Sequence, residues 1–489
     1  QACKAGMNML RVAGPLVYED DALLDAMDRC GVLLWQDLMF ANMDYPEDPE
    51  FVASVSVEVR QQLARLQSRA CLALVCGNSE GEQQAAMSGA SRELWSPPLF
   101  HEVIAGLVQA EGFAYVPSSA HGGAFPHAAD SGPSSYYGVG AYLRPLEDAR
   151  RSAVVFASEC LAFANIPEDA CLPGGPAARV HHPAWKARSP RDLGAGWDFD
   201  DVRDHYVQRL FAIDPAALRA SDHERYVALG RVATGEVMAA VFSEWRRARS
   251  VTRGGLIWFL RDLWPGAGWG IVDASGSPKP CYYPLRRSLS PIAVSISDEG
   301  VNGLVVHVVN DRAVALDARL ELSLFRDGHV DVGRGASDIR IAPHSAVEIA
   351  ATAMLEGFHD LSYAYRFGPP SAQLVRAALV LRGSGETLAE AFSFPAGLRA
   401  GTGAEVRLDP GAIDTPAGKG RALRIGCARF AQSVSIDIAG FLPEDNYFHL
   451  APGQSRCIVL DELPNRRPGR VRGTVAALNS SSQVRVEIA

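Results

Sequence analysis

Short apolar runs alternate with longer amphipathic stretches from residue 6 to about residue 285, and this alternation constrains the fold more than any other feature of the chain. A repeated strand-like run followed by a helix-like stretch is typical of βα units around a parallel sheet. Seven runs are candidate strands, at residues 7–12, 32–38, 72–76, 114–117, 136–139, 153–158 and 255–260. Helical periodicity is clearest at residues 20–29, 51–67 and 225–247. Seven units predict an α/β domain over residues 1–288, a (β/α)8-type barrel that lacks its first strand.

The character of the sequence changes after Pro284, where short strand-like runs separated by Gly, Asp, Asn and Pro turns replace the helical stretches. Candidate strands lie at residues 303–309, 318–325, 339–349, 361–367 and 377–381. Such a series predicts an all-β domain, an immunoglobulin-like β-sandwich over residues 289–396. A Gly-rich stretch at residues 396–404 is typical of a linker. We expect a second immunoglobulin-like β-sandwich over residues 397–489.

Composition excludes several classes of protein. Apolar residues make up 48% and charged residues 21% of the 489 residues, which is typical of a globular protein and not of a disordered one. The 47 basic and 56 acidic residues give a formal net charge of -9, so the positive field that attracts nucleic acids and anionic membranes is missing. No apolar run reaches the length of about eighteen residues that a membrane span needs. A neutral or polar small molecule is the better match as a partner.

Metal-binding patterns are missing as well. The nine cysteines form no CxxC pair and the twelve histidines form no HExxH motif, so we predict neither a disulfide framework nor a metal site. We interpret the cysteines as mostly buried thiols, and their odd number favours a reducing cytoplasm. The chain begins without Met and is inside a patterned element by residue 6, so we expect further sequence upstream.

Two carboxylates stand at the carboxyl ends of candidate strands, where βα barrels place their active sites. Glu80 follows the run at 72–76 after Gly77, Asn78 and Ser79, and Glu159 follows the run at 153–158 directly. With one strand missing upstream, these two runs are strands 4 and 7 of a complete barrel. The ends of those strands face one pocket from opposite sides of a closed barrel, so we expect the two carboxylates to share a site.

Two carboxyl groups that face one site can cleave a glycosidic bond, because one donates a proton to the leaving oxygen while the other attacks the anomeric carbon or activates water. Separations of about 5–5.5 Å lead to retention of configuration, and separations of about 6.5–9.5 Å lead to inversion. The spacing of Glu80 and Glu159 in sequence does not choose between these outcomes. Each glutamate can also be an ordinary charged residue that caps a strand, which is the commoner case for a single strand-end Glu.

A series of motifs resembles, in order along the chain, the barrel of glycoside hydrolase family 2, and within it the β-mannosidase branch. In the first part these motifs are Gly6-Met-Asn-Met-Leu-Arg-Val12, Tyr18-Glu19, Leu34-Trp-Gln-Asp-Leu-Met-Phe-Ala41, Tyr45-Pro46, Cys76-Gly-Asn-Ser-Glu80 and Phe156-Ala-Ser-Glu159. Further along they are Trp258-Phe-Leu-Arg-Asp-Leu-Trp-Pro265, Trp269, Asp273, Pro278-Lys279, Tyr282-Tyr283, and finally Asp445-Asn-Tyr-Phe448 with Pro452-Gly453. The likeness spans nearly the whole chain.

That family is a retaining one, with its acid/base after barrel strand 4 and its nucleophile after strand 7. The resemblance therefore implies that Glu80 is the general acid/base and that Glu159 is the nucleophile. It implies an exo-glycosidase that hydrolyses terminal β-mannosides, with a carbohydrate as its partner and with no metal or organic cofactor. Counting strands from the sequence leads to the same two positions.

Residues around the two glutamates have supporting roles in this hypothesis. Arg11 ends the first candidate strand and can hold Glu159 ionised through charge-assisted hydrogen bonds, although a structural salt bridge is an equally good interpretation. The resemblance implies that Asn78 lies beside the acid/base, and that Tyr136 and Tyr137 lie near the nucleophile. We expect these four residues to contact the substrate.

Three more residues complete the predicted site. Trp258 ends the last candidate strand, where its ring can form an aromatic floor for the apolar face of a sugar. Trp35 and Asp37 end the second candidate strand. We expect them to pack behind the site and to hydrogen-bond its residues, with direct contact to the sugar as the less favoured alternative.

The chain departs from the family pattern at three places. The first is at Arg11-Val-Ala-Gly-Pro15, which lacks an aromatic that many relatives carry. The second is at Trp258-Phe-Leu-Arg-Asp262, where the family pattern usually reads Trp-Gln-Leu-Asn-Asp. The third is Cys160, which follows the position of the nucleophile, where a small or aromatic residue is commoner. Because both glutamates are present, these changes bear on the identity of the sugar more than on the reaction. A cysteine hydrolase built on Cys160 is disfavoured, since no motif places a histidine beside it.

Two alternatives stay open. The same fold and the same glutamates would serve a β-galactosidase, a β-glucuronidase or an exo-β-glucosaminidase. The chain can also be a truncated, non-catalytic carbohydrate-binding remnant, because a missing first strand leaves a barrel edge unpaired. A panel of aryl glycosides separates the first alternative from the leading hypothesis, and binding without turnover would favour the second.

Overall fold

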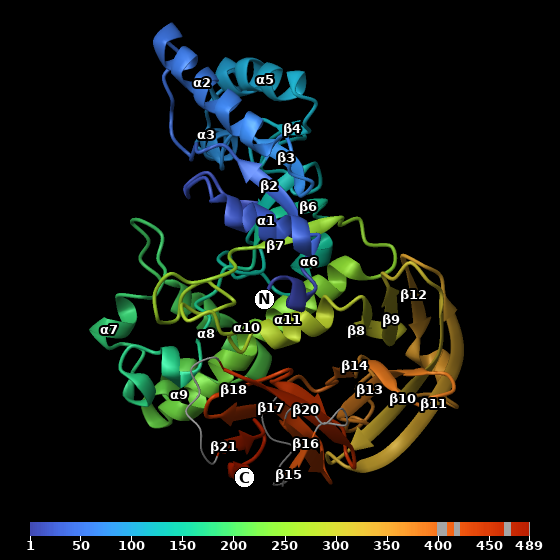
Figure 1. Cartoon of the computed structure of the whole chain (residues 1–489). Coiled ribbons are helices and arrows are strands. Elements are labelled where there is room, and N and C mark those ends of the chain that lie inside the picture. Colours follow the sequence, from blue (N-terminus) through green and yellow to red (C-terminus); the bar gives the residue numbers. More distant parts are fainter. Residues whose placement is uncertain (399–407, 415–420, 464–470, 489) are drawn as a thin grey trace. The chain divides into compact units, whose positions relative to one another are not determined.

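The computed structural model describes residues 1–398, 408–414, 421–463 and 471–488. The chain forms two compact units, Gln1–Ala162 with Val251–Leu260, and Phe163–Ser250 with Arg261–Ala489. Figure 1 labels many of the elements of both units. Most of the predicted linker at 396–404 lies outside the described residues. The domain boundaries predicted near residues 288 and 396 stay predictions.

The first unit contains two parallel sheets. One consists of β1 (Met9–Val12), β2 (Leu33–Asp37), β3 (Leu72–Cys76) and β4 (Tyr115–Val116), and the other of β5 (Pro133–Tyr136), β6 (Phe156–Cys160) and β7 (Gly254–Ile257). β1 and β7 contact one another. All seven predicted strands and their parallel direction are therefore present, whereas closure into a barrel stays a prediction.

Two of the predicted strands are displaced along the sequence. The sixth was expected at 153–158 but begins at Phe156, because residues 148–151 form a short helix and Ala153 then adopts a left-handed conformation with φ of 46°. The fifth was expected at 136–139, but β5 ends at Tyr136, which pairs with Cys160 of β6. The displacement places Glu159 inside β6 rather than directly after it.

Short and long helices separate the strands of the first unit. They are α1 (Asp21–Cys30), α2 (Pro49–Leu66), α3 (Gly81–Met87), α4 (Arg92–Trp95), the π-helical turn η2 (Leu99–Ile104), α5 (Ala105–Ala110) and α6 (Asp148–Arg151). Side chains fix their starts: the carboxylate of Asp20 accepts the Leu23 N–H at 3.2 Å, and that of Asp48 accepts the Phe51 N–H at 3.0 Å.

Helical spacing explains how α2 covers the sheet. Its buried side chains, Val55, Val59 and Leu63, recur every four residues and therefore form one stripe along the helix. They share a core with the buried Val75 of β3 and Phe100 of η2. This core fixes the end of β3, where the predicted acid/base follows.

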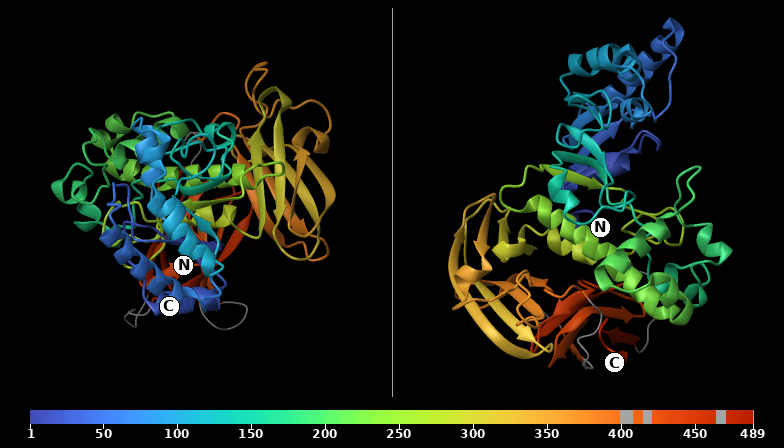
Figure 2. Two further views of the ribbon diagram at one scale, coloured as in Figure 1. Left: turned by 90° about the horizontal axis from the view of Figure 1, so that it is seen from above. Right: turned by 180° about the vertical axis from the view of Figure 1, so that it is seen from behind.

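The second unit begins with a group of helices. They are α7 (Pro183–Lys186), α8 (Phe199–Phe211), α9 (Pro215–Ser221), α10 (His223–Arg246) and α11 (Tyr282–Ser288). Figure 2 shows α10 as the long helix beside α11. Gly235 permits their close approach, because a Cβ there would lie 3.0 Å from the Pro284 side chain. Among the helices that the structure describes, none combines the length and apolar character needed to cross a membrane.

Two antiparallel sheets follow α11. One contains β10 (Leu316–Arg326), β11 (Val330–Ile341), β13 (Leu374–Leu381) and β14 (Thr387–Ser393), and the other β8 (Ile292–Asp298), β9 (Leu304–Asn310) and β12 (Ser345–Ala350). Alternate residues of β10, such as Ala318, Leu320 and Leu322, are buried in a core that also contains Val306 and Val308 of β9. This alternation is typical of sheets that face each other across a core.

The sequence analysis was wrong about two strands here. The run at 339–349 is not one strand, because His344 has φ of 49° and the chain turns between β11 and β12. Residues 361–367 do not form a strand. Their N–H groups bond instead to Asp360, whose carboxylate accepts from Ala364, Tyr365 and Arg366 at 2.9–3.1 Å. A side chain that satisfies consecutive N–H groups replaces a neighbouring strand as their partner.

Two further antiparallel sheets follow. One contains β15 (Leu408–Asp414), β16 (Arg421–Cys427), β18 (Phe441–Pro443) and β20 (Ser455–Glu462), and the other β17 (Ala431–Ile438), β19 (Phe448–Leu450), β21 (Val471–Ala476) and β22 (Val484–Ile488). The motif at residues 445–448 joins strands: the side-chain oxygen of Asn446 accepts the Ile436 N–H at 2.8 Å, and its amide donates to the Ile436 carbonyl at 3.0 Å. That part of the family-like pattern is therefore structural.

Candidate active site

The parallel pairing of strands brings side chains far apart in sequence to one end of the sheets in the first unit. Arg11 pairs with Trp35 in the register of β1 and β2, and Asp37 follows two residues later on the same face of β2. β6 supplies Glu159, and the turn after β3 supplies Ser79 and Glu80. All these residues belong to the first unit.

Arg11 is the centre of this group. Its Nη1 donates to Glu159 Oε1 at 2.7 Å, and its Nη2 donates to Asp37 Oδ2 at 2.7 Å and to Ser79 Oγ at 3.2 Å. Only 5% of the Arg11 side chain is exposed. A planar guanidinium has five fixed donors, which explains how one buried side chain serves acceptors from three strand ends.

Trp35 and Asp37 hold Arg11 in place. The indole N–H of Trp35 donates to Asp37 Oδ1 at 2.8 Å, and the Gly14 N–H donates to Asp37 Oδ2 at 3.0 Å. The guanidinium carbon of Arg11 lies 5.8 Å from the centre of the Trp35 ring, within the range of a cation–π contact. Trp35 and Asp37 thus lie against Arg11, and their supporting role in the site stays a prediction.

Glu159 is buried and receives two strong donors. Besides Arg11, the Tyr137 hydroxyl donates to Glu159 Oε2 at 2.8 Å. Burial raises the pKa of Glu159, Arg11 lowers it, and the negative charge of Glu80 raises it, so that it lies at about 7. The sequence analysis expected Arg11 to hold Glu159 ionised. Arg11 acts in that direction, but burial and the second carboxylate outweigh it.

Glu80 lies on a turn and is only half-buried. It precedes α3 in a left-handed conformation with φ of 62°, and its N–H donates to the Ser119 carbonyl at 2.6 Å. The side-chain amides of Gln83 and Gln84 donate to its two carboxylate oxygens at 3.3 and 3.2 Å. A non-glycine residue in this region of φ and ψ is strained, so neighbouring contacts must hold it there.

Asn78 builds the turn that carries Glu80. Its Oδ1 accepts the Gly81 N–H at 2.9 Å and the Ser118 hydroxyl at 2.8 Å, while its Nδ2 donates to the Pro117 carbonyl at 3.0 Å. Both lone pairs of Oδ1 are thus used within the protein. Asn78 therefore shapes the turn, and its expected contact with the substrate stays a prediction.

The other predicted residues separate into two groups. Tyr137 reaches Glu159, but the hydroxyl of Tyr136 donates to Asp148 at 2.9 Å, because successive side chains of a strand point to opposite faces. The expectation that Tyr136 faces the nucleophile is therefore corrected. Trp258 directly follows β7, and its backbone N–H donates to the Cys160 carbonyl at 2.8 Å, which ties it to the strand that carries Glu159.

Cys160 is buried and does not act as a nucleophile in this arrangement. Its thiol donates to the Leu256 carbonyl at 3.3 Å, and burial raises its pKa, so the reactive thiolate is disfavoured. Six of the nine cysteines are buried, in agreement with the expectation of mostly buried thiols. Within the described residues, no group of three His, Cys, Asp or Glu side chains has the arrangement of a metal site.

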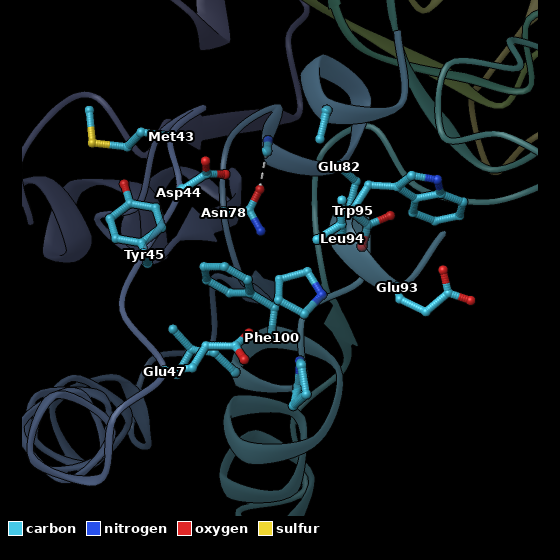
Figure 3. A pocket seen from close by; sticks show the side chains of 15 residues that line it. Met43, Asp44, Tyr45, Glu47, Asn78, Glu82, Glu93, Leu94, Trp95 and Phe100 are labelled. Atoms are coloured by element: carbon cyan, nitrogen blue, oxygen red, sulfur yellow. Dashed lines mark hydrogen bonds between the residues drawn. The ribbon is translucent and has the colours of Figure 1, made fainter. Parts of the chain in front are cut away.

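A pocket of about 270 Å³ adjoins the Glu80 turn (Figure 3). Asn78 and Glu82 line it together with the aromatic side chains of Tyr45, Trp95 and Phe100. Its residues come from the segment after β2 and from α3, α4 and η2. The strand counting did not identify this pocket, because it is built by the segments that follow the strands.

Sequence reasoning also missed the residues that bond to the two key side chains. Ser79 accepts from Arg11, and Gln83 and Gln84 donate to Glu80. Ser79 lies between two residues that were identified, so its position at the strand end was the available signal. Gln83 and Gln84 lie three and four residues after Glu80, which is the spacing of side chains that meet on a helix.

Comparison with known proteins places this geometry in a wider context. No protein-family model matches the chain. Beta-mannosidase B of Aspergillus niger is 28% identical over 319 residues, which cover 61% of this chain and 37% of that protein. Beta-mannosidase B of Thermothelomyces thermophilus is 27% identical over 318 residues, covering 59% and 36% respectively. The chain thus spans little more than a third of the length of these curated relatives.

Solved structures show the same fold. A beta-D-mannosidase from Dictyoglomus thermophilum superposes with a TM-score of 0.81 at 23% identity, covering 95% of this chain and 55% of that one. An exo-chitosanase from Amycolatopsis orientalis superposes with a TM-score of 0.72 at 14% identity, covering 100% and 61%. The fold is therefore that of these glycosidases. The curated relatives and these structures are thus all glycosidases to which the chain is similar in sequence or in fold.

Proposed function

We propose that this chain carries the catalytic part of a retaining exo-glycosidase that hydrolyses terminal β-mannosides by double displacement. The observation that carries the proposal is the pair of carboxylates: Glu159 accepts from Arg11 and Tyr137, and the charge of Glu80 acts on it. Two carboxyl groups that act on each other's ionisation titrate as a coupled pair, so one of them can hold a proton while the other is ionised. Glycoside hydrolysis needs that state, with one acid and one base.

The proposed first step is the transfer of the sugar to the protein. Glu159 attacks the anomeric carbon while Glu80 donates its proton to the glycosidic oxygen, so the bond to the leaving group breaks and a glycosyl ester forms on Glu159. In the second step the Glu80 carboxylate takes a proton from water, whose oxygen attacks the anomeric carbon and releases Glu159. Two inversions give net retention.

The contacts of Glu159 suit this sequence of steps. Arg11 and Tyr137 fix both oxygens, so attack occurs from one orientation and with little loss of entropy. When the ester forms, Glu159 loses its charge, and Arg11 keeps Asp37 as an ion-pair partner at 2.7 Å. The arginine therefore does not become an unpaired buried charge at the intermediate, which would be costly.

The proposed architecture follows the sequence prediction. Residues 1–288 would form the (β/α)8-type barrel, with the ends of β3 and β6 facing the same pocket, and residues 289–396 and 397–489 would form two immunoglobulin-like sandwiches. The likeness to the mannosidase fold supports this assignment. Trp258 would then offer its ring to the sugar, as an aromatic at the end of the strand beside β6.

Trapping the glycosyl ester tests the proposal. The full protein that contains this chain is incubated with a 2-deoxy-2-fluoro-β-mannosyl fluoride, in which fluorine slows both steps while fluoride still leaves readily. We expect a stoichiometric mass increase in the peptide that contains Glu159, and none in a Glu159→Gln variant. A label on another residue, or turnover with inverted product, would remove Glu159 from the proposed role.

The sugar is tested separately with a panel of aryl β-glycosides. Beta-mannosidase B relatives favour the β-mannoside, and the likeness to an exo-chitosanase keeps an exo-β-glucosaminidase as the second candidate. A β-galactoside or β-glucuronide as the best substrate would change the sugar and leave the two-carboxylate mechanism in place. Binding of sugars without any turnover would instead favour the carbohydrate-binding remnant.

A further inference from the structure

A second carboxylate near Glu80 takes no part in the proposed steps. Glu82 accepts from His101 Nε2 at 2.7 Å through Oε1, and from His121 Nδ1 at 2.9 Å through Oε2. The two imidazole rings lie 5.8 Å apart. We call these three side chains the Glu82 cluster. Because an ionised carboxylate only accepts hydrogen bonds, each of these ring nitrogens carries a proton.

The Glu82 carboxylate is buried, and both of its oxygens are paired. Only 1% of the Glu82 side chain is exposed, whereas 26% and 33% of the histidine side chains are. Burial raises the pKa of Glu82, but the hydrogen bonds from His101 and His121 lower it further than burial raises it, so the pKa lies below its ordinary value. A buried carboxylate is tolerated when both oxygens are paired in this way.

The cluster ties together three segments that are separate in sequence. Glu82 lies in the first turn of α3, His101 in η2, and His121 in the segment between β4 and β5. That last segment also contains Ser119, whose carbonyl accepts the Glu80 N–H at 2.6 Å. The turn of Glu80 is therefore attached to the same segment on both sides, through its own N–H and through Glu82.

We propose that Glu82, held by His101 and His121, is a positioning residue that keeps the Glu80 turn in its left-handed conformation. This inference rests on the proposed function, in which Glu80 is the acid/base. Without the cluster, the connection between α3 and the segment after β4 is reduced to weaker contacts, such as that of the Glu82 N–H with Ser118 Oγ at 3.5 Å, and φ of 62° at Glu80 is enforced less firmly. The Glu80 carboxyl group then points to the leaving oxygen in a smaller fraction of molecules.

The two histidines donate through different ring nitrogens, so each has its own conservative replacement. His121 donates through Nδ1, so His121→Asn keeps a donor at nearly the same place, whereas His121→Ala removes it. His101 donates through Nε2, so His101→Gln is its conservative replacement and His101→Ala its deletion. Glu82→Gln keeps the shape of the acceptor but removes its charge and turns an N–H group toward one histidine, so the charge-assisted bonds of the cluster are lost.

The kinetic readout is the dependence on the leaving group. A general acid matters most when the leaving oxygen is basic, so loss of positioning reduces kcat/KM for a methyl β-mannoside and spares a 2,4-dinitrophenyl β-mannoside. For Glu82→Gln and His121→Ala we expect a loss of about 10- to 100-fold for the first substrate and less than about threefold for the second. His121→Asn and His101→Gln are expected to restore most of this loss.

A matched control separates positioning from general damage. Asp28→Asn also converts a carboxylate to an amide in the first unit, where Asp28 accepts the Cys71 N–H at 2.7 Å and lies 3.7 Å from Arg69. We expect it to change neither substrate by more than about twofold. Amide hydrogen exchange in the peptide 77–88 gives a readout without turnover, and it should accelerate in Glu82→Gln and His121→Ala but not in His121→Asn.

The outcomes distinguish this inference from the proposed function. Glu80→Gln is the reference, and equal losses for both substrates in that variant would contradict the acid role of Glu80 itself. If Glu80→Gln discriminates between leaving groups while Glu82→Gln loses both substrates equally, the cluster is only structural and the inference fails. Unchanged exchange at residues 77–88 in His121→Ala would overturn it as well, whatever the kinetics.

Discussion

Glu159 lies on a strand and is held by a guanidinium and a phenol, whereas Glu80 lies on a turn and is held by neutral amides. Arg11 and Tyr137 reach Glu159 at 2.7 and 2.8 Å, and Gln83 and Gln84 reach Glu80 at 3.3 and 3.2 Å. The shorter contacts are the charge-assisted or phenolic ones, which are also the stronger ones. One carboxylate is thus fixed firmly, and the other is held loosely by groups that cannot change charge.

The difference suits two different tasks. A nucleophile has to keep one orientation and to be a carboxylate when it attacks, and a nearby cation favours that form. An acid/base gives up and regains a proton in each cycle, and neutral amides bond to it without committing it to one state. The predictions below test whether the two surroundings really divide the work in this way.

Removing the carboxylate of Glu159, which lies on β6, should have the largest effect on activity. We expect Glu159→Ala to reduce kcat/KM for every aryl glycoside by at least about 10³-fold, since Glu159 is the group that forms the ester in the proposed mechanism. The small side chain leaves space for an external anion, so azide should restore turnover and give the glycosyl azide of inverted configuration. Azide rescue with retained configuration would assign the nucleophile to another residue.

Replacing the Arg11 guanidinium by an ammonium group should have the next largest effect on activity. Arg11→Lys keeps the charge but has no planar fork with which to reach Glu159, Asp37 and Ser79 together. We expect kcat/KM to fall by about 10²-fold, because truncating a buried charge pair typically costs about 3–5 kcal/mol and the lysine recovers part of that. Arg65→Lys, which changes a pair with a largely exposed Asp21, is the control and should have little effect. Similar losses in both variants would contradict the central role of Arg11.

Replacing Glu159 by Gln should change the dependence of stability on pH. Because burial and Glu80 raise its pKa to about 7 in the folded state, against about 4.3 unfolded, the folded state binds this proton more tightly. The contribution is present below pH 4 and is lost as the pH rises through 7, a change of about 4 kcal/mol. Glu159→Gln does not titrate, so its melting temperature relative to wild type should be higher at pH 8 than at pH 5.

Calorimetry at these two pH values decides this prediction. Asp28→Asn is again a suitable control: its folded pKa is lowered, mainly by the Cys71 N–H, so Asp28 is ionised in the folded and the unfolded state at both pH values. We therefore expect the melting temperature of Asp28→Asn relative to wild type to be the same at pH 5 and pH 8, while that of Glu159→Gln rises. A relative melting temperature of Glu159→Gln that does not rise between pH 5 and pH 8 would mean that the environment of Glu159 favours its charge.

The residues of the site that lie on strands could be predicted from the sequence more completely than those on the turn that carries Glu80. Arg11, Trp35, Asp37 and Glu159 lie on short apolar strands, where the period of two residues and the parallel order determine which side chains meet. β3 was predicted at its exact bounds, which located Glu80. The contacts of Glu80 depend on a turn and on short helices, where no such period operates.

Two errors show the limit of the same reasoning. Tyr136 and Tyr137 are adjacent, and the sequence could not say which of them faces Glu159 until the register of β5 against β6 was known. Residues 361–367 carry the apolar alternation of a strand, but the Asp360 carboxylate binds three of their N–H groups. In the first case the pairing of β5 with the distant strand β6 determines which tyrosine faces Glu159. In the second case the local Asp360 carboxylate determines that no strand forms.

The pair of tyrosines provides the finest test of the comparison. Tyr137→Phe removes a hydroxyl that donates to Glu159 at 2.8 Å, whereas Tyr136→Phe removes one that donates to Asp148 at 2.9 Å. Both variants delete one oxygen atom from neighbouring residues of the same strand end, so their effects on packing are similar. We expect Tyr137→Phe to lower kcat/KM by about tenfold, the equivalent of one hydrogen bond to a charged group, and Tyr136→Phe by less than about threefold.

The effect of Tyr137→Phe on pH dependence separates catalysis from packing. Its hydroxyl lowers the pKa of Glu159, so removing it should move the titration of the carboxylate pair to higher pH. The acidic limb of the kcat/KM profile, where the nucleophile becomes protonated, should therefore shift upward in Tyr137→Phe and stay in place in Tyr136→Phe. Equal shifts in both variants would mean that Glu159 responds to the general packing of this strand end, and the distinction between firmly and loosely held carboxylates would lose its basis.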